Sequence, residues 1–125
     1  MSRILLVDDD PELLQVLSLR LQQDGYDVAT ANTGDQAIAE ASRRPPDLMV
    51  LDLGMPRGNG FKVLERVRAS VRTAATPVIV LTGNLEPAFE IRARKAGADE
   101  FLHKPTELAD LVATIQKLLA KAPSS

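Results

Sequence analysis

Three short, continuous apolar runs constrain the fold of this chain more than any other feature. They occupy residues 4–7, 48–51 and 78–81, and each is rich in branched side chains. A strand that is buried on both faces has this pattern, because a parallel sheet covered by helices leaves no face for polar residues. Two weaker runs, at 26–30 and 101–102, alternate or are very short, so we expect them at the edges of the sheet.

Helical patterns follow each of these runs. The most regular apolar stripe lies near the C-terminal end and includes Leu111 and Ile115. In the second helical segment, Thr33 and Gln36 have the spacing of a capping box, which marks a helix start. In the fourth segment, Gly97 is the expected end, since a left-handed residue is commonly needed there. The chain therefore alternates strand and helix five times.

This alternation predicts an α/β fold of the (βα)5 type, a doubly wound parallel sheet with helices on both faces. With the second and fifth strands at the edges, the simplest strand order is 2-1-3-4-5, the flavodoxin-like pattern. Ligands of such sheets bind outside the carboxyl ends of the strands where the order reverses, which is after strands 1 and 3. We expect one domain over residues 1–121 and a loose tail at 122–125.

Polar residues follow the central runs at those positions. Asp8 and Asp9 come after the first strand, Asp52 after the third, Thr82 after the fourth and Lys104 after the fifth. Three carboxylates in one crevice repel one another, and burial raises carboxyl pKa values. A divalent cation resolves that conflict, and oxygen ligands without histidine or cysteine suit Mg²⁺.

These residue types suit transfer of a phosphoryl group onto an aspartate. Asp52 would act as the nucleophile and form an acyl phosphate. Lys104 supplies a compact positive charge and Thr82 a hydroxyl donor for the phosphoryl oxygens. Asp10 is different, because it precedes Pro11 and is expected to cap the first helix.

Four segments resemble the receiver domain of two-component response regulators, over about residues 3–120. They read LLVDDDPELL, DLMVLDLGMPRGNG, PVIVLTG and AGADEFLHKP. The resemblance implies that Asp52 is the phospho-acceptor and that Asp9 and Asp52 bind Mg²⁺ directly. It further implies that Asp8 acts on the metal largely through water and that Gly54 contributes its backbone carbonyl.

The resemblance also implies a switch made by Thr82 and Phe101, with Lys104 beside the phosphoryl group. Our hypothesis is that the loops of Thr82 and Lys104 move inward, opening space that the Phe101 ring fills. The surface of the fourth helix, fifth strand and fifth helix would then change. The family often has tyrosine where this chain has Phe101, and alanine where it has Gly83. A phenolic hydrogen bond is therefore impossible here, and the loop after Thr82 is expected to be looser.

The partners that the resemblance implies are a histidine kinase or a histidine phosphotransfer protein as donor and a downstream effector protein or domain as output. Small acyl phosphates can replace the protein donor in this family, and homodimerisation on phosphorylation is left open. The chain would be a regulatory phospho-acceptor that assists only its own phosphotransfer and dephosphorylation, and not an enzyme. His103, the single histidine, is expected at the surface rather than in a relay.

Composition argues against several other classes. A net charge of −2 and a single tyrosine without tryptophan give no reason to expect direct nucleic-acid binding. No apolar run approaches the roughly 18 residues that a membrane helix needs, and cysteine is absent. The expected compartment is the cytoplasm.

Two other functions stay open. In haloacid-dehalogenase-like phosphatases the nucleophilic aspartate is followed two residues later by a second one, the spacing of Asp8 and Asp10. Against this, Asp10 is expected to be a cap, Asp52 would have no role, and a substrate-covering domain is missing. The second alternative is a pseudo-receiver scaffold that binds partners without being phosphorylated.

Overall fold

A computed structural model describes residues 1–121 of the chain. One sheet of five parallel strands has the order β2-β1-β3-β4-β5, which confirms the expected topology. The strands are β1 (Arg3–Val7), β2 (Asp27–Ala31), β3 (Leu48–Leu51), β4 (Val78–Thr82) and β5 (Glu100–His103). The helices are α1 (Pro11–Gln23), α2 (Gly34–Arg43), α3 (Asn59–Ala69), α4 (Pro87–Lys95) and α5 (Leu108–Lys121), with a 3-10 turn, η1 (Pro56–Gly58), before α3. The tail expected at 122–125 lies outside the described residues.

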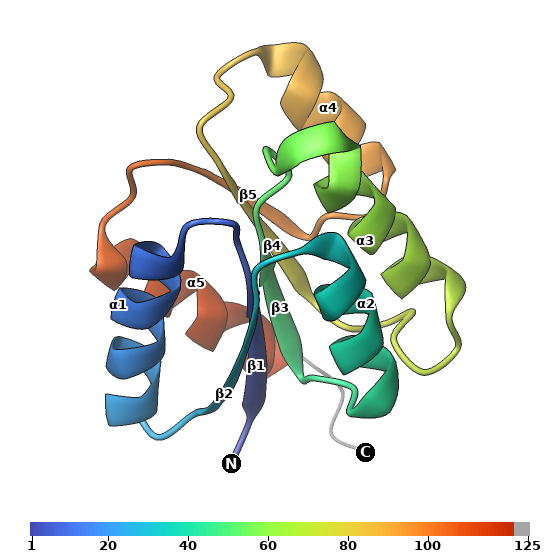
Figure 1. The fold of residues 1–125 in the computed structure, drawn as a ribbon. Coiled ribbons are helices and arrows are strands. Elements are labelled where there is room, and N and C mark those ends of the chain that lie inside the picture. The colour runs from blue at the N-terminus through green and yellow to red at the C-terminus, as the bar shows by residue number, and fades with distance from the viewer. Residues whose placement is uncertain (122–125) are drawn as a thin grey trace.

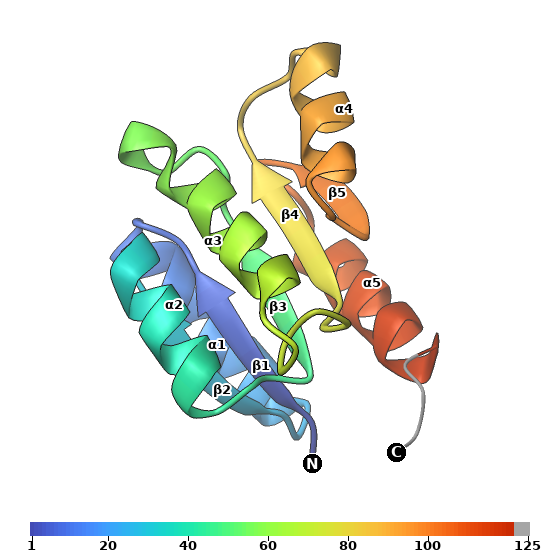
Figure 2. The same cartoon turned by 90° about the vertical axis from the view of Figure 1, so that its right-hand side faces the viewer.

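The sheet lies between two helical layers (Figures 1 and 2). Helices α1 and α5 cover one face, and α2, α3 and α4 cover the other. Successive residues of β1 enter opposite cores: Leu5 and Val7 pack under α2–α4, whereas Ile4 and Leu6 pack against α1 and α5. Burial on both faces explains why the central strands read as unbroken apolar runs.

Side chains fix the starts of the first two helices. Asp10 caps α1, its Oδ1 accepting from the backbone N–H of Glu12 at 3.0 Å, as its place before a proline predicts. Thr33 caps α2, its hydroxyl oxygen accepting from the N–H of Gln36 at 3.1 Å. The Gln36 side chain returns to the N–H of Asn32, one residue before the position that a standard capping box uses.

The edge strands differ most from expectation. Strand β2 begins and ends one residue later than the run at 26–30, and β5 extends by one residue on each side of 101–102. Most of β2 is half-buried, which confirms its edge position. Helix α4 starts at Pro87 as expected and stops at Lys95, with Gly97 at φ 112° just beyond it. Within residues 1–121, no helix combines the length and hydropathy that crossing a bilayer requires.

The amino ends of the strands meet at a rim held by ion pairs around Arg3, which we call the amino-end rim. The Arg3 side chain is 11% exposed, and its two terminal nitrogens reach Asp27 at 3.2 Å and Glu40 at 2.6 Å. Arg44 is also paired with Asp27, and Arg43 with Glu40. The hydrogen bond from Arg43, together with the charge of Arg3, holds the pKa of Glu40 below its ordinary value. Asp27 and Glu40 therefore each pair with two arginines.

Candidate functional site

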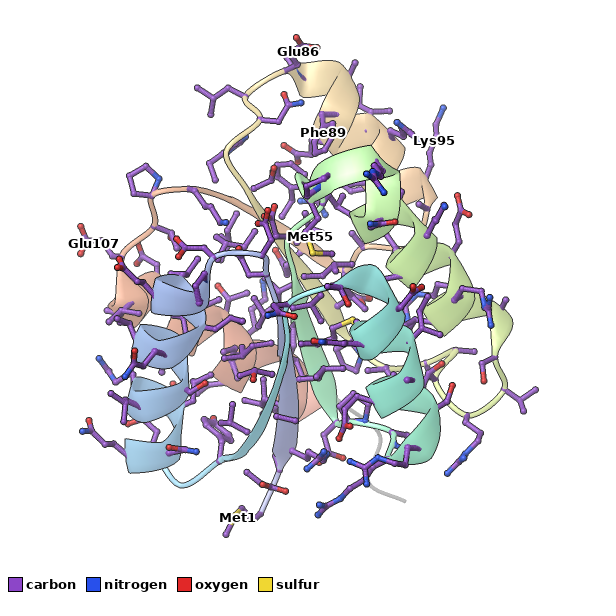
Figure 3. All side chains as sticks on the ribbon, in the orientation of Figure 1. Met1, Met55, Glu86, Phe89, Lys95 and Glu107 are labelled. Atoms are coloured by element: carbon purple, nitrogen blue, oxygen red, sulfur yellow. The ribbon has the colours of Figure 1, made fainter. Side chains whose placement is uncertain are left out.

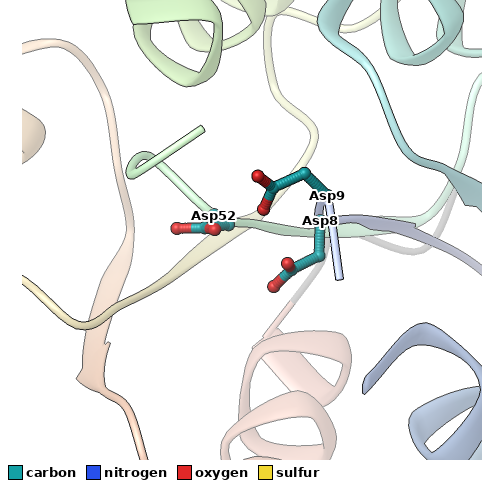
Figure 4. A group of neighbouring side chains, drawn as sticks. All are labelled: Asp8, Asp9 and Asp52. Atoms are coloured by element: carbon teal, nitrogen blue, oxygen red, sulfur yellow. The ribbon is translucent and has the colours of Figure 1, made fainter. Parts of the chain in front are cut away.

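Strand register brings the sequence-predicted acids together. Val7 and Leu51 are partners in the β1–β3 ladder, so the residues that follow them, Asp8 and Asp52, leave the sheet side by side. The N–H of Asp52 donates to the carbonyl of Val7 at 2.9 Å, which extends the ladder past both strand ends. Figure 4 shows the three carboxylates of this acid cluster, Asp8, Asp9 and Asp52, gathered at this edge. One carboxylate oxygen from each lies within 4.8 Å of the others.

The acid cluster is largely withdrawn from water. Asp8 is 4% exposed and Asp52 6%, whereas Asp9 is exposed. Backbone donors hold one oxygen of each buried acid: the N–H of Asp10 bonds Asp8 at 2.9 Å, and that of Gly54 bonds Asp52 at 2.8 Å. Burial raises the pKa of Asp8, and the nearby Asp52 charge adds to the rise, as expected for acids in one crevice.

Lys104 follows β5 and is the cation of this edge. Its Nζ lies 2.6 Å from Asp8 Oδ2 and 3.3 Å from Asp52 Oδ2. Burial alone would lower the pKa of this ammonium, but the hydrogen bond to Asp8 and the charge of Asp52 outweigh it, so the pKa is raised. The sequence hypothesis had the Lys104 loop moving inward to reach the site. In the structure Lys104 already contacts Asp8 and Asp52, and the movement expected on phosphorylation stays a prediction.

Thr82 and Gly54 lie on the other side of Asp52. Thr82 is the last residue of β4 and is fully buried, and its hydroxyl oxygen accepts from the N–H of Asn84 at 3.2 Å. A β-carbon added at Gly54 would lie 3.1 Å from Asp52 Oδ1 and 3.5 Å from Thr82 Oγ1. Glycine at this position therefore leaves open the space between the carboxylate and the hydroxyl. The backbone also couples the two loops, since the N–H of Lys104 donates to the carbonyl of Thr82 at 2.7 Å.

Phe101 is 8% exposed and packs in the core beneath α4. The ring is therefore largely buried in this structure, and its movement on phosphorylation stays a prediction. One of its contacts is with Phe89 of α4, which the sequence analysis missed: its ring lies 6.4 Å from that of Phe101 and 5.4 Å from that of Phe61. Figure 3 labels Phe89 on the α3 side of α4. The only sequence signal for it is a large apolar residue in the first turn of a helix whose second half is rich in charged residues.

Two further sequence-derived assignments agree with the structure. His103 is exposed, as expected, although its ring packs edge-on against that of Phe101, with 5.1 Å between the ring centroids. The Asp10 carboxylate is used by the α1 cap, so it is not a member of the acid cluster. The site therefore comprises the acid cluster, Lys104 and Thr82, with Gly54 beside them.

An apolar groove of about 400 Å³ opens next to this site, between α1 and the loop after β5. Leu13, Leu17 and Leu108 contribute apolar walls, and Lys104 lies in its lining. The groove thus adjoins the acid cluster through Lys104, which contacts Asp8 and Asp52.

Comparisons with known proteins agree with this arrangement. The family model described as response regulator receiver domain matches residues 4–116. The chain is 39% identical over 121 residues to the DNA-binding dual master transcriptional regulator RpaA of Synechocystis sp., covering 97% of this chain and 50% of RpaA. The chain thus spans about half the length of that relative.

Two solved structures extend the likeness to three dimensions. Chemotaxis protein CheY4 of Vibrio cholerae has a TM-score of 0.89 and 33% identity, covering 94% of this chain and 98% of CheY4. The receiver domain of sensor histidine kinase PA1611 from Pseudomonas aeruginosa PAO1 has a TM-score of 0.87 and 29% identity, covering 96% and 98%. That domain was solved with a magnesium ion coordinated in its active site cleft.

Proposed function

This chain belongs to the response regulator receiver domain family, whose members act in two-component signal transduction, and from that premise we propose that Asp52 is its phospho-acceptor. The observation that carries this proposal is the setting of one buried aspartate. Asp52 lies beside two further acids and one lysine, at the sheet edge where doubly wound folds bind ligands. In the reaction, an Asp52 oxygen forms a bond to phosphorus while the bond from phosphorus to the donor breaks.

The donor set of the acid cluster fits a magnesium ion. All its side-chain ligands are carboxylate oxygens, and one oxygen from each lies within 4.8 Å of the others. Asp9 and Asp52 would bind the ion directly, Asp8 through water, and Gly54 through its backbone carbonyl. When bound, Mg²⁺ supplies positive charge that offsets repulsion between the acids and an incoming phosphoryl group. Burial is the main cause of the raised pKa of Asp8, and the charge of Asp52 adds to it, so a bound cation would favour the ionised form of this acid.

Lys104 and Thr82 would contact the phosphoryl oxygens. The Nζ of Lys104 lies 3.3 Å from Asp52 Oδ2, so the ammonium would exchange its carboxylate partners for a phosphoryl oxygen. Thr82 Oγ1 accepts from Asn84 but can donate its own proton to a phosphoryl oxygen. That new bond would draw in the loop between β4 and α4, and so alter the surface of α4, β5 and α5.

The protein donor would dock on the apolar groove between α1 and the loop after β5. This groove includes Lys104 in its lining, so a partner bound there has direct access to Asp52. A phosphohistidine on a kinase or phosphotransfer domain is the expected donor, and an effector protein or domain the expected output. Leu13→Asp at the groove should slow transfer from such a protein while leaving labelling by a small phosphoramidate unchanged. Equal slowing with both donors would argue against the groove.

The decisive experiment measures the mass added by phosphoramidate with and without Mg²⁺. Wild type should gain one phosphoryl group only with Mg²⁺, and Asp52→Asn should gain none. Asp8→Asn distinguishes the phosphatase alternative, because removing a metal ligand slows labelling whereas removing a nucleophile abolishes it. Labelling that persists in Asp52→Asn and disappears in Asp8→Asn would overturn the proposal. A wild type that is never labelled would favour the unphosphorylated scaffold.

A further inference from the structure

A cavity of about 250 Å³ opens beside the acid cluster, and Lys104 is not among the residues that line it. Asp9 lines this cavity and also belongs to the acid cluster, so the two spaces adjoin. The opposite wall comes from the turn after Asp52 and includes Arg57, and a third side is formed by Thr33 at the start of α2. Asp52 does not line this cavity, so a small phosphoryl donor held there would reach Asp52 past Asp9, which the cavity and the acid cluster share.

Arg57 has an uncommon backbone conformation. Its φ of 63° and ψ of 24° lie in the left-handed region, which costs a residue with a β-carbon roughly 1 kcal/mol or more. The turn therefore keeps a long cationic side chain at a position where glycine would be less strained. Across residues 1–121, no side-chain hydrogen bond or ion pair engages its guanidinium, unlike those of Arg3 and Arg68. Arg57 is thus an exposed cation available to a ligand.

The cavity lining places one cation, Arg57, across from one carboxylate, Asp9, which belongs to the acid cluster. The acid cluster carries three carboxylates and contacts a single lysine, so a phosphoryl donor approaching it is repelled. Arg57 supplies positive charge in the cavity wall, whereas the positive end of the α2 dipole is partly offset by Asp35 in the first turn of that helix. A guanidinium also binds carboxylates with matched geometry.

We propose that Arg57 selects phosphoryl donors whose leaving group is a carboxylate, which are the small acyl phosphates. This inference rests on the proposed function of Asp52. As the Asp52 oxygen bonds to phosphorus, the phosphorus–oxygen bond of the donor breaks and its electron pair leaves with the carboxylate; no proton is transferred. Arg57 stabilises the negative charge that grows on this leaving group. Donors that release an amine or imidazole develop no such charge, so Arg57 gives them no advantage.

The test compares two small donors on the same protein with saturating Mg²⁺. Acetyl phosphate releases a carboxylate, and phosphoramidate releases an amine. Arg57→Asn removes the cation but tolerates the left-handed backbone, and Arg57→Lys restores the charge. Arg66→Asn is the matched control, since Arg66 is also an exposed arginine but lines a separate cavity between α2 and α3. The second-order rate constant of phosphorylation is followed by the mass of the intact protein.

For Arg57→Asn we expect about a fivefold lower rate constant with acetyl phosphate, the size of one solvent-exposed charge pair, and no change with phosphoramidate. Arg57→Lys should recover most of the loss, and Arg66→Asn should behave as wild type. An equal fall with both donors, or no fall with either, would overturn the role of Arg57 while leaving Asp52 as the acceptor. If wild type is labelled by neither donor, the failure lies instead with the proposed function.

Discussion

Acidic side chains converge on a long cation at both ends of the sheet, yet the two ends differ in how their charge is balanced. At the amino-end rim, Asp27 and Glu40 share three arginines, and each acid has two of them as partners. At the acid cluster, Lys104 is the one cation paired with the three carboxylates within residues 1–121, and it contacts Asp8 and Asp52. The pKa of Glu40 is lowered, chiefly by its hydrogen bond from Arg43, whereas that of Asp8 is raised, chiefly by burial.

This contrast distinguishes the amino-end rim, whose ion pairs stabilise the fold, from the acid cluster, whose charges suit a bound ligand. At the amino-end rim, Asp27 and Glu40 each pair with two arginines, although Arg3 Nε has no hydrogen-bond partner among residues 1–121. At the acid cluster, carboxylates outnumber their cationic partners, so an added cation would reduce the repulsion between them. Charge balance therefore identifies the functional edge without any reference to sequence motifs.

The largest expected effect is on the rate constant for phosphorylation, and it should distinguish Lys104 from Arg3. Lys104→Met should lower the rate constant for phosphorylation about 100-fold, roughly 2.7 kcal/mol of transition-state stabilisation, as for other groups that contact developing charge. Arg3→Met should leave this rate constant unchanged, because Arg3 lies at the opposite end of the strands. Labelling with phosphoramidate, followed by mass, measures both. A comparable loss in Arg3→Met would break the comparison.

The next effect is on folding. Arg3→Met should lower the free energy of unfolding by about 2 kcal/mol, because it removes two ion pairs made by a side chain that is only 11% exposed. Methionine keeps the apolar stem of Arg3, so the loss reports on the charge. Arg20→Met is the control: its partner Asp24 forms an exposed pair on α1, and we expect a change of 0.5 kcal/mol or less, on the order of a surface pair. Urea unfolding measures both, and equal losses would contradict the prediction.

A third effect sharpens the comparison through metal binding. Mg²⁺ at ten times its dissociation constant should raise the free energy of unfolding by about 1.4 kcal/mol. Asp9→Asn should remove most of this gain at the same Mg²⁺ concentration. Glu40→Gln should retain it in full, although its starting stability is lower. Thermal unfolding with and without Mg²⁺ gives the difference, and a gain that survives Asp9→Asn would place the ion elsewhere.

The smallest expected effect is on how the free energy of unfolding of the metal-free protein depends on pH. Asp8 and Glu40 should contribute dependences of opposite sign. Asp8 has a raised pKa, so its contribution to stability is present below its ordinary value of 3.8 and is lost as the pH rises through the folded-state pKa. Glu40 has a lowered pKa, so its contribution is present above 4.5 and is lost as the pH falls through the folded-state pKa. Asp8→Asn should therefore remove a decline on the alkaline side of about pH 4, and Glu40→Gln a decline on the acid side. Slopes of the same sign in urea unfolding would refute the assignment.

The sequence was sufficient for those features that depend on neighbouring residues or on strand order. Unbroken apolar runs predicted the central strands, and Asp10 before Pro11 predicted the α1 cap. The convergence of Asp8, Asp52 and Lys104 followed from parallel strands ending at a common edge.

Features that depend on long-range side-chain contact were not accessible in the same way. Arg3 reads as an ordinary charged residue before an apolar run, and only the fold brings it to Asp27 and Glu40. The preformed contact of Lys104 and the burial of Phe101 against Phe89 also depend on how loops and α4 pack. The left-handed backbone at position 57 could not be predicted from the sequence, because arginine rarely adopts that conformation.

The hydrogen bond between the N–H of Lys104 and the carbonyl of Thr82 has a consequence for how a signal would leave the site. Lys104 and Thr82 would both respond to phosphorylation, and this backbone hydrogen bond couples the segments that carry them. A shift of one segment should therefore shift the other. Intermediate states in which one has responded and its neighbour has not are thereby disfavoured. The output should therefore switch between two states rather than change gradually.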